Sequence, residues 1–154
     1  MNTFSHFAET SFLCALFREQ DNSQSAIDYE AKLDAPFAVS SLVLFEFRHS
    51  TRLQTFRFNR DRTQGFSAIE ATLALEALRI KMDAESLIVA PVDWADVYHR
   101  AEQISSQHAQ ELGVREMDTL HVATALHLGS KHFLTLDALQ AKLARAVGLK
   151  SPLP

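Results

Sequence analysis

The feature that most constrains the fold is a series of short apolar segments separated by longer helical patterns. We expect strands over residues 3–8, 36–41, 86–92 and 132–136. We expect helices over residues 10–19, 25–33, 41–56 or beyond, 67–84, 93–110, 118–128 and 137–147. Only four glycines and four prolines interrupt the chain, which favours long helices over many hairpins. Strands of this kind between helices predict an α/β fold: a three-layer α/β/α sandwich with a mainly parallel central sheet.

Composition restricts the class of protein. The 154 residues are 47% hydrophobic and 22% charged, which predicts a single globular domain over residues 1–154. A net charge of -4 argues against a protein that coats nucleic acid through bulk charge, although a local basic patch is compatible with it. The lone Cys14 excludes an internal disulfide and favours a reducing cytoplasm. The chain shows neither a secretory signal nor a membrane-spanning apolar run, so we expect no membrane partner.

Acidic residues stand where the expected strands end. Glu9 follows the first strand, Asp137 follows the last strand, and Asp118 opens the helix before that last strand. Glu46 interrupts an apolar helix, where an unpaired carboxylate is costly. Because parallel sheets bind ligands beyond the carboxyl ends of their strands, these four carboxylates are candidates for one site. A divalent cation would relieve their repulsion, and oxygen ligands favour Mg²⁺ or Mn²⁺ over zinc.

The four acids also have purely structural interpretations. Asp118 and Asp137 begin helices, where an aspartate is more often a cap than a metal ligand. Glu9 can serve as a first-turn acid that interacts with the helix dipole. Glu46 can pair with Arg52 or with the backbone of a neighbouring strand. Hydrophobic periodicity alone does not choose between these interpretations and the metal site.

Three further residues are candidates for supporting roles. His121 follows Asp118 by about one helical turn and so shares its face, either to support the site or as a satisfied, partly buried histidine. Thr135 stands near the end of its strand, where it can hydrogen-bond an acid, although strand propensity explains it equally well. Thr10 or Ser11 is expected to cap the first helix.

An arginine-rich segment, 48–62, holds five arginines against one acid, with Phe56 and Phe58 interleaved. Arginines can bind phosphates while an aromatic ring stacks on a base, which would make this segment an RNA contact. The alternative is a solvated helix face with the phenylalanines in the core. The candidates for RNA contact are Arg48, Arg52 and Arg57.

Three stretches together resemble the PIN domain family, in the branch of the VapC-type toxin ribonucleases. "MDTLHVATALHLGSKHFLTLD" resembles the C-terminal half of that domain and is the most specific of the three. "ETSFLCALFREQDNSQSA" resembles the N-terminal block, and "VSSLVLFEFRHS" resembles the middle block that carries the helix glutamate. The resemblance covers essentially the whole chain in the right order. It implies an α/β/α sandwich and a hydrolase: an Mg²⁺- or Mn²⁺-dependent nuclease that acts on RNA.

The resemblance also implies roles for particular residues and partners. The implied catalytic acids are Glu9, Glu46, Asp118 and Asp137, of which Glu9, Asp118 and Asp137 would bind the metal ion. The implied supporting residues are Ser11, Thr135 and His121. The expected partners are RNA, an antitoxin protein of a type II toxin–antitoxin pair, and a second copy in a homodimer, for which the hairpin over 41–84 is a possible interface.

One position departs from the family's pattern, because the first acid is usually an aspartate and here it is Glu9. The added methylene displaces the carboxylate by roughly 1.5 Å if the backbone stays in place. A misplacement of that size can cost about a hundredfold in rate. The alternative function is therefore a catalytically weakened PIN-like module that binds RNA or protein. A third interpretation makes the acids helix caps in a domain that serves in assembly.

Overall fold

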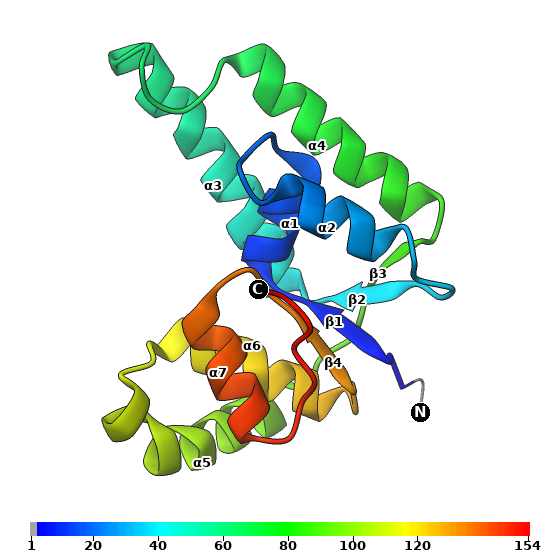
Figure 1. Ribbon diagram of the computed structural model, residues 1–154, viewed down its shortest axis with the longest axis vertical. Helices are drawn as coiled ribbons and strands as arrows, with labels where there is room; N and C mark the ends of the chain where they lie inside the picture. Colours follow the sequence, from blue (N-terminus) through cyan, green and yellow to red (C-terminus); the bar gives the residue numbers. More distant parts are fainter. Residues whose placement is uncertain (1–2) are drawn as a thin grey trace.

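A computed structural model describes residues 3–154 and has the expected α/β/α architecture (Figure 1). Its strands are β1 (His6–Ala8), β2 (Phe37–Val39), β3 (Leu87–Val89) and β4 (His132–Leu134). All pair in parallel, in the order β3-β2-β1-β4. The helices are α1 (Thr10–Phe17), α2 (Ser23–Glu30), α3 (Ser41–Arg60), α4 (Ala68–Asp83), α5 (Trp94–Leu112), α6 (Glu116–His127) and α7 (Ala138–Ala146).

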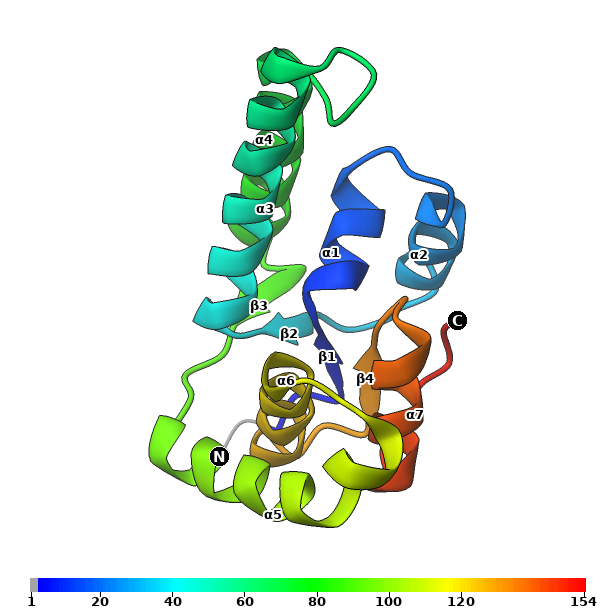
Figure 2. The ribbon, with the colours of Figure 1, turned by 90° about the vertical axis from the view of Figure 1, so that its left-hand side faces the viewer.

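The helices cover both faces of the sheet. Helices α1 to α4 lie on one side and α5 to α7 on the other, as two perpendicular views show (Figures 1 and 2). Strands β1, β2 and β4 are buried between the helix layers: Phe7, Phe37 and Phe133 are at most 1% exposed. These strands therefore show no alternation between apolar and polar residues, as expected for a parallel sheet between helix layers.

Pairs of helices, rather than single helices, connect the strands. Helices α1 and α2 join β1 to β2, α3 and α4 join β2 to β3, and α5 and α6 join β3 to β4. The chain therefore alternates single strands with pairs of helices. Each strand is also shorter than expected, at three residues. The residues on either side belong to loops or to helix caps and not to the sheet.

The strand order places a binding crevice beside β1. The first two connections lead the chain from β1 to β2 and β3 in one direction, and the third returns it to β4 on the opposite side of β1. The chain therefore leaves β1 and β4 toward opposite faces of the sheet. Such a switch point opens a crevice at the carboxyl ends of the two strands. Glu9 directly follows β1, and Thr135 directly follows β4.

No helix in residues 3–154 is long and apolar enough to cross a membrane.

Candidate active site

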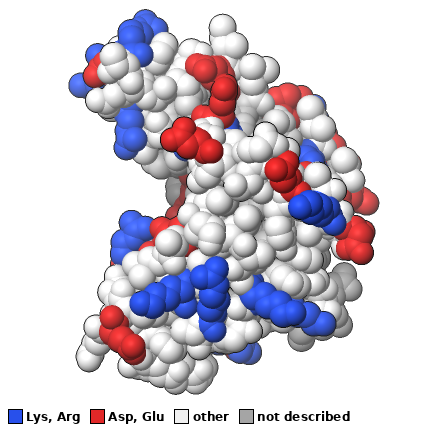
Figure 3. All heavy atoms as spheres, viewed as in Figure 1, with Lys and Arg blue, Asp and Glu red and all other residues white. Residues whose placement is uncertain are grey.

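A cavity of about 360 Å³ lies at the carboxyl ends of β1 and β4. It contains all four of the acids that the sequence singles out. Its lining residues are Glu9, Thr10, Ser11, Cys14, Glu46, Arg115, Glu116, Met117, Asp118, His121, Asp137 and Gln140. Figure 3 shows the molecule hollowed on its left side, with acidic side chains inside the hollow and basic ones on the rims above and below it. The acids in the lining outnumber the cations, which favours a positively charged ligand.

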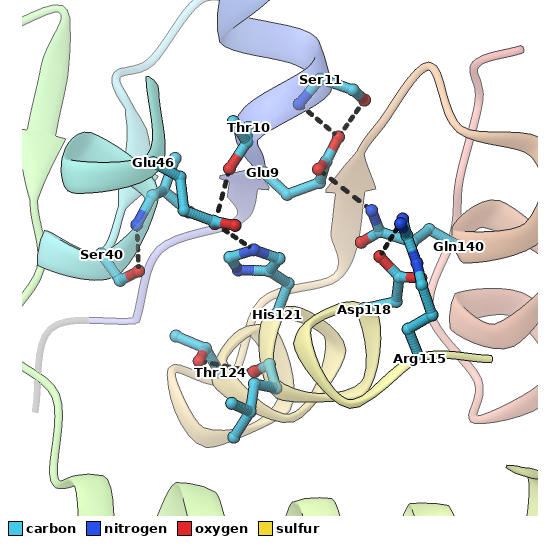
Figure 4. A network of polar contacts seen from close by, with 12 residues as sticks. Glu9, Thr10, Ser11, Ser40, Glu46, Arg115, Asp118, His121, Thr124 and Gln140 are labelled. Carbon is cyan, nitrogen blue, oxygen red and sulfur yellow. Dashed lines mark hydrogen bonds and ion pairs between the residues drawn. The ribbon is translucent and has the colours of Figure 1, made fainter. Parts of the chain in front are cut away.

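Glu9 is buried and is held from two sides (Figure 4). Its Oε1 accepts hydrogen bonds from the Ser11 backbone N–H at 2.9 Å and from the Ser11 hydroxyl. Its Oε2 accepts one from Nε2 of Gln140 at 3.1 Å. Glu9 is therefore the N-cap of α1, and the expectation that Thr10 or Ser11 caps this helix is wrong. The glutamate side chain is long enough to curl back onto the first turn, which leaves the Thr10 hydroxyl free to donate to Glu46.

Glu46 connects α3 to α6. Its Oε1 lies 2.5 Å from Nε2 of His121 and accepts a hydrogen bond from the Thr10 hydroxyl at 2.8 Å. Burial alone would raise the pKa of this carboxyl, but the His121 hydrogen bond and charge, the Thr10 hydroxyl and the charge of Arg115 together hold the pKa below its usual value. Glu46 is therefore ionised at neutral pH. The expected pairing with Arg52 or with a strand backbone is wrong.

His121 is almost completely buried, at 2% exposure, and its Nδ1 has no hydrogen-bond partner within residues 3–154. It lies one turn from Asp118 on the same face of α6, as the sequence predicts, and both side chains line the cavity. Because its Nε2 contacts Glu46, His121 connects helix α6, which carries Asp118, to helix α3, which carries Glu46.

Asp118 lies in the first turn of α6, which begins at Glu116 rather than at Asp118. The carboxylate is buried and does not cap the helix, so the capping interpretation is wrong for this residue. It receives the Arg115 guanidinium, with Nε at 3.1 Å from Oδ2 and a second nitrogen at 3.4 Å from Oδ1. The Arg115 side chain is 73% exposed, so this cation sits at the mouth of the cavity and can turn away into solvent.

Asp137 caps α7, and here the capping interpretation is confirmed: Oδ1 accepts from the Gln140 backbone N–H at 2.9 Å. Asp137 also lines the cavity, so capping and binding do not exclude each other. The Thr135 hydroxyl accepts from the Asp137 backbone N–H at 3.0 Å and lies 3.2 Å from Oγ of Ser11, which accepts from the Leu136 N–H at 2.8 Å. Ser11 and Thr135 thus join the ends of β1 and β4 through the backbone, and Thr135 does not bond an acid.

The three arginines proposed for RNA contact do not share one face of α3. At 3.6 residues per turn, Arg57 lies about 20° around the helix from Glu46 and roughly 16 Å farther along its axis. Arg48 and Arg52 lie about 160° and 120° away. Only Arg57 therefore continues the side of α3 that carries Glu46. The phenylalanines do not fill the core, since Phe56 is 53% exposed and Arg60 and Arg62 lie over Phe56 and Phe58.

Sequence reasoning missed three polar residues of the cavity, Arg115, Glu116 and Gln140, of which Gln140 and Arg115 contact its acids. Gln140 is 4% exposed and contacts both Glu9 and Asp137. Its signal was available, because a Gln three residues after a capping Asp is a common helix-start pattern. Arg115 stands three residues before Asp118, a spacing that favours an ion pair on a helix. Neither signal indicates by itself that the residue faces a cavity.

The residues of the cavity suit a hard cation by their chemistry, since carboxylate oxygens dominate the donor set. Between residues 3 and 154, however, no three Asp, Glu, His or Cys side chains are grouped closely enough to hold a metal ion. In this structure each carboxylate is engaged by a neighbouring donor. Asp118 is held by Arg115, and Glu46 by His121 and Thr10. A cation would replace Arg115 as the partner of Asp118.

The sandwich and its acidic switch-point cavity define a known class of domain. The family model for the PIN domain matches residues 7–146, and the chain belongs to this family. No curated protein matches the sequence. Among solved structures, VapC20 from Mycobacterium tuberculosis, named as a toxin that cleaves the sarcin-ricin loop, is 21% identical, with 97% of this chain and 100% of that chain covered and a TM-score of 0.66.

Two further solved structures have the same fold. VapBC2 from Rickettsia felis, bound to a DNA fragment from its promoter, is 14% identical, with 96% of this chain and 97% of that chain covered and a TM-score of 0.62. FitAcB from Neisseria gonorrhoeae is 14% identical, with 95% of both chains covered and a TM-score of 0.60. The expected resemblance to the PIN family is therefore confirmed, and each of these similarities in fold covers at least 95% of this chain.

Proposed function

We propose that this chain acts as a single PIN domain that hydrolyses RNA phosphodiester bonds with the help of Mg²⁺ or Mn²⁺. The observation that carries the proposal is the meeting of four carboxylates in one cavity at the switch point of a PIN-family sheet. Three of them, Glu9, Asp118 and Asp137, are the residues that would hold the ion. When bound, such an ion supplies charge stabilisation for a phosphodiester attacked by water.

The chain's own residues have separate tasks in this proposal. Glu46 is ionised and hydrogen-bonded to His121, so it contributes a fixed negative charge at the edge of the cavity. Arg115 is exposed at the mouth, and it would be able to bind a phosphate of the RNA if a bound cation took its place beside Asp118. Arg57 extends the basic surface along α3 for a longer strand, while Arg48 and Arg52 face other directions.

The test is cleavage of a panel of structured RNAs in Mn²⁺ or Mg²⁺. The natural protein is compared with Asp118→Asn and Glu9→Asp. The control is Asp21→Asn, which neutralises an exposed carboxylate outside the cavity. Loss of a direct ligand should exceed the roughly 10–100-fold cost of losing an outer-shell partner, so Asp118→Asn should lose at least about a hundredfold. Asp21→Asn should cleave like the natural protein. Equal cleavage by Asp118→Asn and the natural protein would contradict the proposal.

Glu9→Asp separates the enzyme from the weakened binding module. If the natural protein cleaves RNA, the longer carboxylate is tolerated. If it is silent and Glu9→Asp gains cleavage, the site is detuned and the chain serves to bind RNA or protein. The hydrogen bonds from Ser11 and Gln140 support the enzyme function over the binding module, because they hold the Glu9 carboxylate in one position beside the cavity.

The proposal extends to partners. The toxin named VapC20 has the same fold, which supports a toxin of a type II toxin–antitoxin pair acting in the cytoplasm. An antitoxin protein would then be a partner, and a reading frame for it beside this chain's gene is the observation to seek. A homodimer through α3 and α4 is supported by the apolar residues that these helices expose.

A further inference from the structure

Gln140 is a buried polar residue that contacts an acid at each of the two strand ends of the cavity. It is 4% exposed and stands in the first turn of α7. Its side-chain Nε2 donates to Oε2 of Glu9 at 3.1 Å, and its backbone N–H donates to Oδ1 of Asp137 at 2.9 Å. Figure 4 shows the Gln140 amide directed at the Glu9 carboxylate. One residue therefore contacts an acid that follows β1 and another that follows β4.

The hydrogen bond from Gln140 fixes the Glu9 side chain, which would otherwise have more conformational freedom than an aspartate at this position. Glutamate has one more rotatable bond, and its carboxylate needs support at both ends to hold one orientation. Ser11 holds Oε1 and Gln140 holds Oε2. An ionised carboxylate oxygen offers about two acceptor sites, so Oε2 keeps capacity for a cation after the Gln140 bond forms.

The donor is a neutral amide, which matters at a cation site. A lysine or arginine at this position would also hold Glu9, but its charge would compete with a divalent ion for the same carboxylates. Gln140 orients the carboxylate and leaves its charge in place. The amide's own Oε1 is buried without a hydrogen-bond partner among residues 3–154. A buried orphan acceptor is unusual, and here it belongs to a side chain that lines the cavity, where an O–H donor such as a cation's water could reach it.

We infer that Gln140 is a positioning residue that holds the longer Glu9 carboxylate in place as a cation ligand. This inference rests on the proposed function and deepens it. It explains how a PIN domain can carry glutamate at its first acidic position: the extra methylene brings the carboxylate within reach of a donor on α7. A shorter aspartate would withdraw by roughly 1.5 Å and leave that donor behind.

The test is a double-mutant cycle read out by Mn²⁺ affinity, with free Mn²⁺ measured by its paramagnetic resonance signal in the absence of RNA. Gln140→Leu removes the donor at similar volume, and it is made in the natural protein and in Glu9→Asp. We expect Gln140→Leu to weaken Mn²⁺ binding at least about tenfold in the natural protein and less than about twofold in Glu9→Asp, because only glutamate reaches the amide. Gln140→Lys, which restores a donor but adds charge, should also weaken binding.

Controls separate positioning from folding. The exposed Gln110 on α5 gives the matched variant Gln110→Leu, which should bind Mn²⁺ like the natural protein. Thermal melting checks that Gln140→Leu is folded, and Gln140→Met replaces it if it is not. A readout without metal comes from the side-chain amide of Gln140 in a ¹H–¹⁵N spectrum: its protons should exchange slowly in the natural protein and rapidly in Glu9→Asp.

The outcomes distinguish this inference from the function beneath it. Unchanged Mn²⁺ affinity in Gln140→Leu, or an equal loss in both backgrounds, overturns the positioning role while the nuclease proposal stands. Absence of Mn²⁺ binding by the natural protein overturns both. A loss confined to the background with Glu9, together with rapid amide exchange in Glu9→Asp, supports the inference.

Discussion

At the scale of single residues, the charge of Glu46 depends on its contacts more than on its burial. Its partner His121 is 75 positions away along the chain, so no local spacing in the sequence pointed to the pair. The acids themselves were predictable because each stands at the end of a strand or inside an apolar helix. Their partners were not, because the pairing of α3 with α6 across the crevice follows from tertiary packing.

His121→Ala should destabilise the protein and raise the pKa of the Glu46 carboxyl. The change removes a hydrogen bond to a charged group, worth about 1.5–3 kcal/mol, which corresponds to roughly 3–12 °C in Tm for a chain of this size. Burial then dominates the Glu46 carboxyl, whose pKa it raises. Thermal melting at pH 7 measures the first effect, and exposed His99→Ala is the control. An unchanged Tm in His121→Ala would show that the 2.5 Å contact contributes nothing to folding.

A stacked histidine pair should make the protein sensitive to mild acid. His6 and His132, on the neighbouring strands β1 and β4, have ring centroids 4.4 Å apart, and both Nδ1 atoms are buried without partners within residues 3–154. Burial and then the charge of His132 lower the pKa of His6, against a smaller opposing effect of Asp34. Below about pH 6.5, His6 therefore binds a proton more readily in the unfolded chain than in the folded chain.

The sign follows from that difference in proton binding. The stability associated with neutral His6 is present above about pH 6.5 and is lost as the pH falls toward the lowered pKa of the folded state. Melting temperatures between pH 8 and pH 5 should fall for the natural protein and fall less for His6→Phe, which keeps a stacked ring without a titrating group. Exposed His99→Gln should follow the natural protein. Parallel curves for all three proteins would refute the role of the pair.

At the scale of elements, the predicted strands and helices all form, and the differences lie at their ends and connections. Helix α3 was expected to reach Phe56 or beyond, and it continues to Arg60, because its last turn carries Arg57 and Arg60, which interact favourably with the helix dipole. The start of α4 was predictable to one residue, since Ser67 and Glu70 form a capping box. The start of α1 at Thr10 was also predicted, but its cap, Glu9, was not, because a glutamate cap is rare among helix-start signals.

The turn between α3 and α4 should be especially intolerant of a side chain at Gly65. Gly65 has φ +63°, and a Cβ there would lie 2.0 Å from the carbonyl oxygen of Gln54, which is backbone and cannot rotate away. Gly113, with φ +66° and nothing within 4 Å, has the same conformation without the overlap. Gly113→Ala should lower the free energy of unfolding by about 1–2 kcal/mol, because alanine is strained in this left-handed conformation.

Gly65→Ala should cost more than twice as much as Gly113→Ala, because the overlap adds to the conformational strain. Denaturant unfolding of both variants measures the two free energies of unfolding. Since the turn lies at the far end of the α3–α4 hairpin (Figure 1), Mn²⁺ binding at the cavity should be unaffected in any Gly65→Ala protein that remains folded. Equal costs in the two variants would mean that the hairpin end yields to relieve the overlap.

At the scale of the whole molecule, α4 presents two apolar stripes. One stripe faces inward: Ala71 and Leu78 are buried, and Leu75 packs against the core. A second stripe faces outward. Ile69, Leu73 and Ile80 are 74%, 64% and 55% exposed, and helix geometry places them within about 40° of one another. A clustered apolar stripe on the surface is typical of an interface.

A second copy of the chain is the partner that we expect at this stripe. Leu73→Glu should convert the homodimer to a monomer, because it places a charge in the apolar contact at no cost to the core of an isolated chain. Light scattering coupled to size-exclusion chromatography measures the mass, and the neighbouring exposed Thr72→Glu on α4 is the control. If the natural protein is already monomeric at micromolar concentration, the stripe serves another partner.

The adjacency of β1 and β4 also governs when the cavity comes into existence. One side of the crevice is made as soon as the chain begins, while the other waits for the last strand and helix. A chain still being synthesised therefore has Glu9 and Glu46 but lacks the Asp137 side of the cavity until β4 and α7 have been made. If the chain cuts RNA, it can do so only after that segment has packed against β1.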